Sequence, residues 1–321
     1  FGKPPFNKPP AGKPAFAKKP SGGPGAFAPR PPAARPVKGP AKNDWVPAVA
    51  KPPAGAGPSS PAGPSSGAAT DWADVAEWYD SLVGDEGSEY HQKVVFPGVA
   101  RLLALSPGDA FLDVACGQGA LCRLLESKGA VATGIDAAEP LIKAAKDRGP
   151  AEITYHVGDV RELERNPAIP AGAFAAAACV LAIQNLNPVN GVFAGAAKAL
   201  RAGGRFVIVM MHPCFRNPKE THWGWDAEAG TQYRRVDRYL VPRKVPITTH
   251  PGSDPGGYTW TFHKPIEAYV RAARGAGLLI DALEEWPSHK TSQPGPRAAA
   301  ENKAREEIPM FLALRCVKLG A

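Results

Sequence analysis

Long hydrophobic runs are absent from this 321-residue sequence, and their absence limits what the chain can be. A membrane-spanning helix needs about 18 to 20 consecutive apolar residues, and no stretch approaches that length. Cysteine is also scarce. Cys116, Cys122, Cys179, Cys214 and Cys316 are odd in number and show neither CxxC nor Cys-His spacing. We therefore expect a soluble cytoplasmic chain with reduced cysteines, no membrane span and no metal site.

The first 70 residues contain a single acid, Asp44, and almost no Val, Ile or Leu. They hold ten of the 38 basic residues and 18 of the 36 prolines, so this segment carries +9. The rest of the chain has 28 bases and 29 acids and carries −1. A segment of the first kind buries too little apolar surface to offset its ordering entropy. We expect residues 1–70 to be a disordered basic tail rich in Pro, Lys, Ala and Gly, and residues 71–321 to be the folded domain.

Two interpretations of the tail stay open. It is either a solvating linker or a tether that follows a nucleic-acid backbone with regularly spaced lysines and interleaved aromatic residues. The folded part is almost neutral and gives no electrostatic reason to bind nucleic acid. Any contact with nucleic acid is therefore expected through the tail alone.

Apolar segments alternate with helical segments in the folded part. The expected strands are residues 110–114, 131–135, 153–157, 174–181 and 205–211. Helices are expected at 71–83, 90–105, 120–128, 140–147 and 192–200. This alternation indicates an α/β fold, a doubly wound sheet of parallel strands with right-handed crossovers. Ligands of such sheets bind beyond the carboxyl ends of the strands.

A glycine-rich turn follows the first of these strands. Gly117 and Gly119 permit positive φ angles and a close approach of the backbone to a ligand. A dinucleotide site would place a third glycine where Cys122 stands. The turn therefore argues against a bound pyrophosphate.

Acids end the first three strands, at Asp113, Asp136 and Asp159. Asp113 suits a cationic group. Asp136 lies 17 residues beyond Gly119, where a carboxylate can accept both hydroxyls of a ribose, and Asp159 can accept an exocyclic amino group. Together they describe a site for a nucleoside with an amino-acid appendage.

With these residues, 71–321 resembles the class I S-adenosylmethionine-dependent methyltransferases. The family's first motif, an acid followed by a glycine turn, is Asp113-Val114-Ala115-Cys116-Gly117-Gln118-Gly119. Ala115 stands where the first glycine is usual, a replacement that costs little if φ is negative there. The resemblance implies a seven-stranded Rossmann-like sheet whose last strand, 308–317, is antiparallel and follows a strand at 278–284.

The resemblance also implies roles for individual residues. With S-adenosylmethionine as cofactor, Asp113 would orient the methionine moiety and Asp136 would bind the ribose. Asp159 and the backbone of Val160 would meet the adenine. Tyr79 lies in a segment that resembles the family's helix that closes over the methionine end, although it is equally well explained as a core residue.

An insertion of about 50 residues, 213–263, follows the fifth strand and is rich in aromatic residues and arginines. It resembles the lid that small-molecule members of the family build over the acceptor. We expect Arg216, Trp223, Trp225 and Tyr239 to bind a small organic substrate, and residues 181–187 to line the methyl-donor pocket.

His212, at the end of the fifth strand, is the first candidate for a general base, and His263 is the second. A methyltransferase of RNA or protein, tethered by the tail, remains an alternative. So does a non-catalytic binding module of the same fold. A nicotinamide-dependent enzyme is the least favoured.

Overall fold

The computed structural model describes residues 72–73, 75–248 and 258–320. The predicted disordered tail, 1–70, lies outside the described residues, and so does the stretch 249–257 of the predicted lid. None of the helices in the described ranges is long and apolar enough to cross a lipid bilayer.

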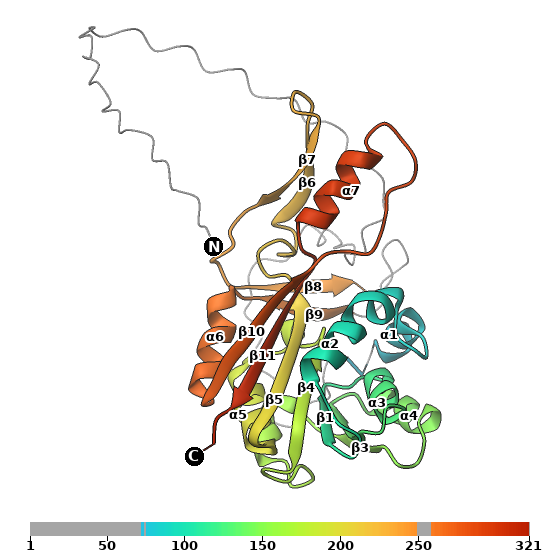
Figure 1. Cartoon of the computed structure of the whole chain (residues 1–321), viewed down its shortest axis with the longest axis vertical. Helices are drawn as coiled ribbons and strands as arrows, with labels where there is room; N and C mark the ends of the chain where they lie inside the picture. The colour runs from blue at the N-terminus through green and yellow to red at the C-terminus, as the bar shows by residue number, and fades with distance from the viewer. Residues whose placement is uncertain (1–71, 74, 249–257, 321) are drawn as a thin grey trace, which may run out of the picture. The chain divides into compact units, whose positions relative to one another are not determined.

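Seven strands form the central sheet, in the order β10-β11-β5-β4-β1-β2-β3. Their bounds are β1 Ala110–Val114, β2 Val131–Asp136, β3 Thr154–Val157, β4 Phe174–Val180, β5 Leu200–Met211, β10 Leu278–Trp286 and β11 Phe311–Lys318. Strands β1 to β5 pair in parallel, whereas β11 pairs antiparallel with both β5 and β10. The predicted doubly wound sheet with an antiparallel last strand is confirmed (Figure 1).

Helices cover both faces of the sheet because successive strand residues point to opposite sides. Leu112 and Val114 of β1 belong to the core that includes α5 (Asn190–Ala199) and α6 (Ile266–Gly275). Phe111 belongs to the other core, with α2 (Phe96–Leu103), α3 (Ala120–Glu126) and α4 (Glu139–Arg148). The central strands are thus buried on both faces, which explains their continuous apolar sequence.

Shorter helical segments lie around this framework. The first helix, α1, spans Ala76–Val83, and the predicted helix 90–105 is a π-helical turn, His91–Val95, that runs directly into α2. Two 3₁₀ turns, Val160–Arg165 and Ile183–Asn185, follow β3 and β4. Helix α7 spans Ala298–Glu307, between β10 and β11.

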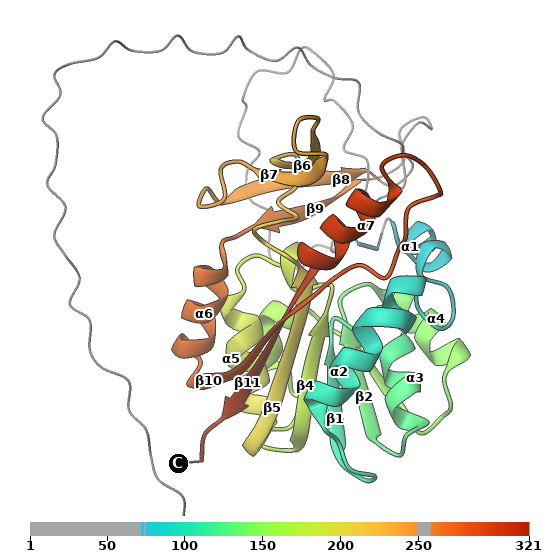
Figure 2. The same cartoon turned by 45° about the horizontal axis from the view of Figure 1, so that its top comes forward.

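The predicted insertion contains two β-hairpins. Strands β6 (Thr221–Asp226) and β7 (Thr231–Val236) form the first, and β8 (Arg243–Thr248) and β9 (Tyr258–His263) form the second. In the first turn, the Asp226 carboxylate accepts the N–H groups of Glu228 and Ala229, and Gly230 supplies a positive φ of 63°. Figure 2 shows both hairpins and α7 gathered beyond the carboxyl ends of the parallel strands, where ligands of such sheets bind.

Candidate active site

The glycine turn between β1 and α3 has the backbone that its sequence predicts, with one correction. Gly117 and Gly119 have φ angles of 54° and 81°, and a Cβ at Gly119 would collide with the hydroxyl of Tyr155. Ala115, however, has φ 63°. Our expectation that alanine costs little there assumed a negative φ and is wrong. A side chain in the left-handed region is strained by about 1–2 kcal/mol.

Asp136 ends β2 directly beneath this turn. Its Oδ2 accepts the N–H of Gly117 and its Oδ1 accepts the N–H of Ala138, both at 2.9 Å. These bonds hold the carboxylate against the turn, although burial outweighs them and raises the pKa of Asp136. Each oxygen keeps a further lone pair, so the half-buried carboxylate is suited to two adjacent hydroxyls of a ligand.

Asp113 lies deeper, with 2% of its surface exposed. The Cys122 thiol donates to its Oδ2 over 3.5 Å. Burial raises the pKa of Asp113 to about 7, the Cys122 hydrogen bond opposes that rise, and the nearby Asp136 adds to it. Asp113, Ala115 and Tyr79 line one small hollow of about 30 Å³. The structure therefore brings three of the predicted cofactor residues to one place.

Asp159 and Val160 occupy the end of β3. The Asp159 carboxylate accepts the backbone N–H of Arg161 and also pairs with the Arg161 guanidinium at 2.5 Å. Partial burial disfavours the charge of Asp159, but the Arg161 hydrogen bonds prevail and lower its pKa. Val160 is buried, at 2% exposure. Adenine binding by Asp159 and Val160 stays a prediction, and Asp159 would meet adenine as a carboxylate already bound to arginine.

Tyr79 projects from α1 toward the glycine turn. A Cβ at Gly117 would lie 3.3 Å from Cε1 of Tyr79, and the tyrosine ring meets Trp72 edge to face with centroids 5.5 Å apart. Burial and the nearby Asp136 and Asp113 raise the pKa of the Tyr79 hydroxyl, which therefore stays protonated. Tyr79 also borders a second, larger cavity.

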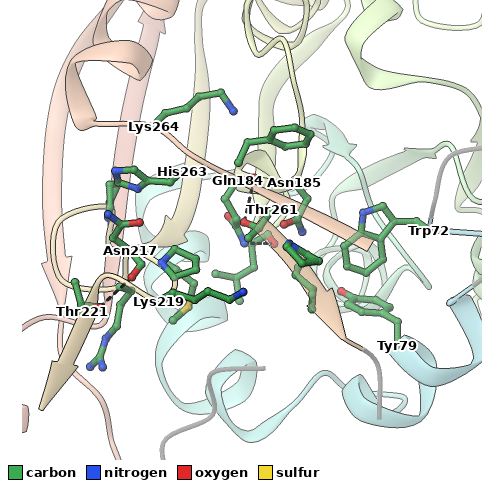
Figure 3. Close-up of a pocket in the computed structure, with 18 of the residues that line it drawn as sticks. Trp72, Tyr79, Gln184, Asn185, Asn217, Lys219, Thr221, Thr261, His263 and Lys264 are labelled. Carbon is green, nitrogen blue, oxygen red and sulfur yellow. Dashed lines mark hydrogen bonds between the residues drawn. The ribbon is translucent and has the colours of Figure 1, made fainter. Parts of the chain in front are cut away.

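This larger cavity has a volume of about 170 Å³ and lies between α1, the end of β4 and the insertion (Figure 3). Its wall is aromatic at the α1 end, where Trp72, Trp78 and Tyr79 lie. Gln184 and Asn185 come from the turn after β4, within the segment predicted to line the pocket. From the insertion and its flanks come Arg216, Asn217, Lys219, Thr261, Phe262, His263 and Lys264.

His263, one of the two predicted bases, lines this cavity. Its Nε2 is 2.7 Å from the main-chain oxygen of Tyr239, which can only accept, so Nε2 carries the proton and Nδ1 keeps a lone pair. Among the described residues, no partner is seen for Nδ1. Burial lowers the pKa of His263, aided by the nearby Arg243 and Lys264 and opposed by the Tyr239 bond. The imidazole is neutral at pH 7 and able to accept a proton.

His212 directly follows β5, as predicted, but it is 2% exposed and does not line the cavity. Its Nδ1 accepts the N–H of Cys214 at 3.2 Å, and its Nε2 contacts Oε1 of Glu285 at 2.7 Å. Since both ring nitrogens are engaged, His212 is not available to a substrate as a base. The correction is that His212 holds the turn after β5.

Only Arg216 of the four predicted substrate-binding residues lines the cavity. Trp223 lies beneath two arginines of the insertion, 5.6 Å from Arg216 and 4.9 Å from Arg234. Trp225 lies under Arg297 at 4.6 Å, and α7 begins at the next residue. The Tyr239 hydroxyl accepts a hydrogen bond from the N–H of Ile266, and its main-chain carbonyl accepts one from Nε2–H of His263. These three residues support the insertion around the cavity.

The sequence did not reveal Asn217, Thr261 and Lys264 as cavity residues. A signal for Thr261 did exist, because Thr259, Thr261 and His263 alternate along β9 and all are buried. Nothing in the sequence marks Asn217 or Lys264. Within the described ranges, no group of three His, Cys, Asp or Glu residues is placed to hold a metal ion.

Comparisons with known proteins agree with this geometry. A methyltransferase-domain family model matches residues 112–208, the segment that contains the glycine turn and the acids. A solved S-adenosylmethionine-dependent methyltransferase from Mesorhizobium loti superposes with a TM-score of 0.55 at 28% identity, covering 69% of this chain and 96% of that one. Residues 112–208 thus form a methyltransferase domain, and the described part of the chain has the fold of a solved S-adenosylmethionine-dependent methyltransferase.

Curated relatives of this methyltransferase include a demethylmenaquinone methyltransferase from Tropheryma whipplei, 28% identical over 190 residues. They also include a ubiquinone biosynthesis O-methyltransferase from Xanthomonas axonopodis pv. citri, 28% identical over 178 residues. These alignments cover 58% and 54% of this chain. The chain spans 63% and 64% of the length of those two proteins.

The family's cofactor, S-adenosylmethionine, fits the residues present. The turn at Gly117 and Gly119 admits a ligand against its backbone, and Asp136 offers two acceptor oxygens to a ribose. Asp113 offers a buried carboxyl group in the hollow beside the turn, where it would face the methionine moiety of a bound cofactor. When bound, the cofactor supplies an electrophilic methyl group.

Proposed function

We propose that this protein transfers a methyl group from S-adenosylmethionine to a small organic acceptor bound in the larger cavity. One observation carries the proposal: Tyr79 borders both the hollow beside Asp113 and the larger cavity that contains His263. A cofactor on the glycine turn and an acceptor in that cavity would therefore be neighbours. The names of the curated relatives refer to menaquinone and ubiquinone, which supports a small-molecule acceptor.

In this proposal the protein aligns the two reactants and removes one proton. Methyl transfer is an in-line displacement, so holding the attacking atom in line with the methyl group supplies much of the rate enhancement. An acceptor that arrives protonated also needs a base within hydrogen-bonding distance. His263 Nδ1 is that base, and the Tyr239 carbonyl keeps its other nitrogen protonated.

The two hairpins of the insertion and α1 all contribute residues to the wall of the larger cavity. Such walls would shield a bound acceptor from part of the surrounding water during transfer. This arrangement supports the role of the predicted insertion, residues 213–263, as a substrate lid.

Labelled methyl donor, incubated with a metabolite extract, tests the proposal. The intact chain should transfer label to a small molecule. Asp136→Ala should abolish both transfer and cofactor binding measured by calorimetry, because it removes the acceptor for the ribose hydroxyls. Asp147→Ala is the matched control, since Asp147 is exposed on α4 and pairs only with Lys143. Undiminished labelling by Asp136→Ala would refute the cofactor site, and absence of cofactor binding by the intact chain would refute methyl transfer.

A further inference from the structure

Three buried side-chain oxygens in the wall of the larger cavity have no hydrogen-bond donor among the residues that the structure describes. They are Gln184 Oε1, Asn185 Oδ1 and Asn217 Oδ1, and we call these three residues the amide trio. A buried acceptor without a donor is costly, and native structures contain few of them without a reason. Asn217 is only 1% exposed, so bulk water does not satisfy it. A molecule that occupies the cavity can bring the missing donors.

The orientation of two of these amides is fixed by their other ends. Gln184 Nε2 donates to the carbonyl of Leu181 at 2.7 Å, and Asn217 Nδ2 donates to the carbonyl of Asp237 at 3.4 Å. A carbonyl oxygen can only accept a hydrogen bond, so each amide must turn its NH2 group toward that carbonyl, and neither can be rotated to exchange its nitrogen and oxygen. The unpartnered atoms of Gln184 and Asn217 are therefore oxygens.

His263 adds a fourth acceptor to the same wall. Its Nε2–H group donates a hydrogen bond to the main-chain carbonyl of Tyr239, so Nδ1 offers a lone pair and no proton. Figure 3 shows His263, Gln184, Asn185 and Asn217 around one space. Gln184, Asn217 and His263 thus each leave a hydrogen-bond acceptor unused on this part of the wall.

Four cationic side chains, Arg216, Lys219, Arg234 and Lys264, also line the cavity. Lys264 Nζ donates to the carbonyl of Leu186 at 2.9 Å. Arg234 donates to the carbonyl of Phe215 at 2.8 Å and to the Thr221 hydroxyl at 3.0 Å. A carboxylate beside the amide trio would place its lone pairs against those of the three amide oxygens, so hydroxyl groups suit that part of the wall better.

The volume of the cavity is sufficient for a ring. A protein cavity of about 150 Å³ holds one benzene molecule. At about 170 Å³, this cavity has room for a six-membered ring with small substituents. Trp72, Tyr79 and Phe262 provide the apolar and aromatic surface that such a ring requires.

We infer that the acceptor is a ring bearing at least two hydroxyl groups, one donating to His263 Nδ1 and another to the amide trio. The inference rests on the proposed methyl transfer and names its acceptor. The hydroxyl oxygen at His263 forms a bond to the methyl carbon while the bond from that carbon to sulfur breaks. The electron pair of the broken bond stays on sulfur, giving S-adenosylhomocysteine, and the hydroxyl proton moves to His263 Nδ1. The products are a methyl ether and a protonated histidine that returns its proton to water.

A matched series of probes tests this acceptor class on the full chain loaded with S-adenosylhomocysteine. The probes are 1,2-dihydroxybenzene, 2-methoxyphenol, 1,2-dimethoxybenzene and 2-hydroxybenzoate, with affinities measured by calorimetry. We expect affinity to fall about tenfold with each hydroxyl that is replaced by methoxy. We also expect 2-hydroxybenzoate to bind more weakly than 1,2-dihydroxybenzene. No binding by any probe at millimolar concentration, equal affinities across the series, or tighter binding of the benzoate would overturn the inference.

Substitutions in the amide trio then test its part directly. Gln184→Met and Asn217→Leu keep the size of the side chain and remove the acceptor oxygen. Each should reduce the preference for 1,2-dihydroxybenzene over 2-methoxyphenol about tenfold. The affinity for S-adenosylhomocysteine should stay unchanged, which also shows that the variant is folded. Gln232→Met, a half-buried β7 residue outside the cavity wall, should leave both quantities unchanged.

The failure of this inference can be told apart from failure of the proposed function. If the two trio variants weaken S-adenosylhomocysteine binding and spare the probes, the orphan oxygens serve the cofactor and the inference is wrong. Methyl transfer would then still stand. If the intact chain binds no S-adenosylhomocysteine, the proposed function fails, while the preference among the probes can still be measured on the cofactor-free chain.

Discussion

The Nε2–H group of His263 donates a hydrogen bond to the main-chain carbonyl of Tyr239, 2.7 Å away, and this bond decides which ring nitrogen can act as a base. A carbonyl cannot donate, so the proton stays on Nε2 and the lone pair stays on Nδ1. Tyr239 thereby contributes to the site through its backbone, and its side chain is occupied with Ile266.

The rate of methyl transfer should depend on the protonation of His263. A general base works only when neutral, and burial lowers the pKa of His263 below its ordinary value of about 6.5. We therefore expect kcat/KM to be constant near pH 7 and to fall only below pH 6.5. His263→Ala should lower kcat at least about 100-fold, with cofactor affinity retained, and should remove this acidic limb. A pH profile that is unchanged in the variant would contradict the assignment.

The stability of the cofactor-free protein should depend on Asp113. Its folded-state pKa of about 7 lies above the value of about 3.9 in an unfolded chain. Between these values the folded state holds a proton that the unfolded state has released, so stability falls as the pH rises and levels off above pH 7. The fall amounts to at most roughly 4 kcal/mol, at 1.36 kcal/mol for each pH unit between the two pKa values.

Urea unfolding of the wild type and Asp113→Asn between pH 4 and 8 measures this effect. The amide cannot titrate, so the difference in unfolding free energy between the two proteins should change with pH in the direction just given. Cofactor affinity of the wild type should rise across the same range, because the ionised carboxylate attracts a cationic ligand. A pH-independent difference would show that Asp113 is ionised throughout.

The fold and the cofactor loop could be predicted from the sequence because their signals are local. Segment 110–114 is buried on both faces and reads as a continuous apolar run, and Asp136 ends the next strand along the chain. The strand, the glycine turn and the acid are close to one another along the sequence, so any doubly wound sheet brings these residues together. The φ of Ala115 could not be predicted, since alanine itself gives no sign of a left-handed conformation.

The acceptor side depends on contacts between distant parts of the chain, and sequence reasoning did less well there. It ranked His212 above His263, because His212 ends a strand. Glu285, the partner of His212, lies 73 residues later, and no local sequence pattern predicts their contact. Trp225 was also assigned to the acceptor by composition, whereas it contacts Arg297 beside α7. The aromatic content of the insertion identified it in the sequence, but this content does not predict which of its side chains face the cavity.

His212 should prove important for stability and not for proton transfer. His212→Ala leaves the N–H of Cys214 and the carboxylate of Glu285 without their partner, which should lower the unfolding free energy by about 1–3 kcal/mol. Because His212 is outside the cavity wall, kcat at a temperature where the variant is folded should fall far less than in His263→Ala. Denaturation curves and kinetics on the same samples separate the two effects. A large loss of kcat at unchanged stability would restore His212 as a catalytic candidate.

Ala115→Gly should relieve the strain in the cofactor turn. At φ 63° the Cβ of Ala115 costs about 1–2 kcal/mol, whereas the extra freedom of glycine in the unfolded chain costs about 0.5–1 kcal/mol. The two terms leave a net gain of up to about 1.5 kcal/mol in unfolding free energy, measured by urea denaturation. The matched control is Ala145→Gly in the buried face of α4, where glycine should instead cost about 1 kcal/mol. Equal destabilisation by both substitutions would mean that the turn relaxes to a negative φ in solution, and the strained conformation would then have to be attributed to the bound cofactor.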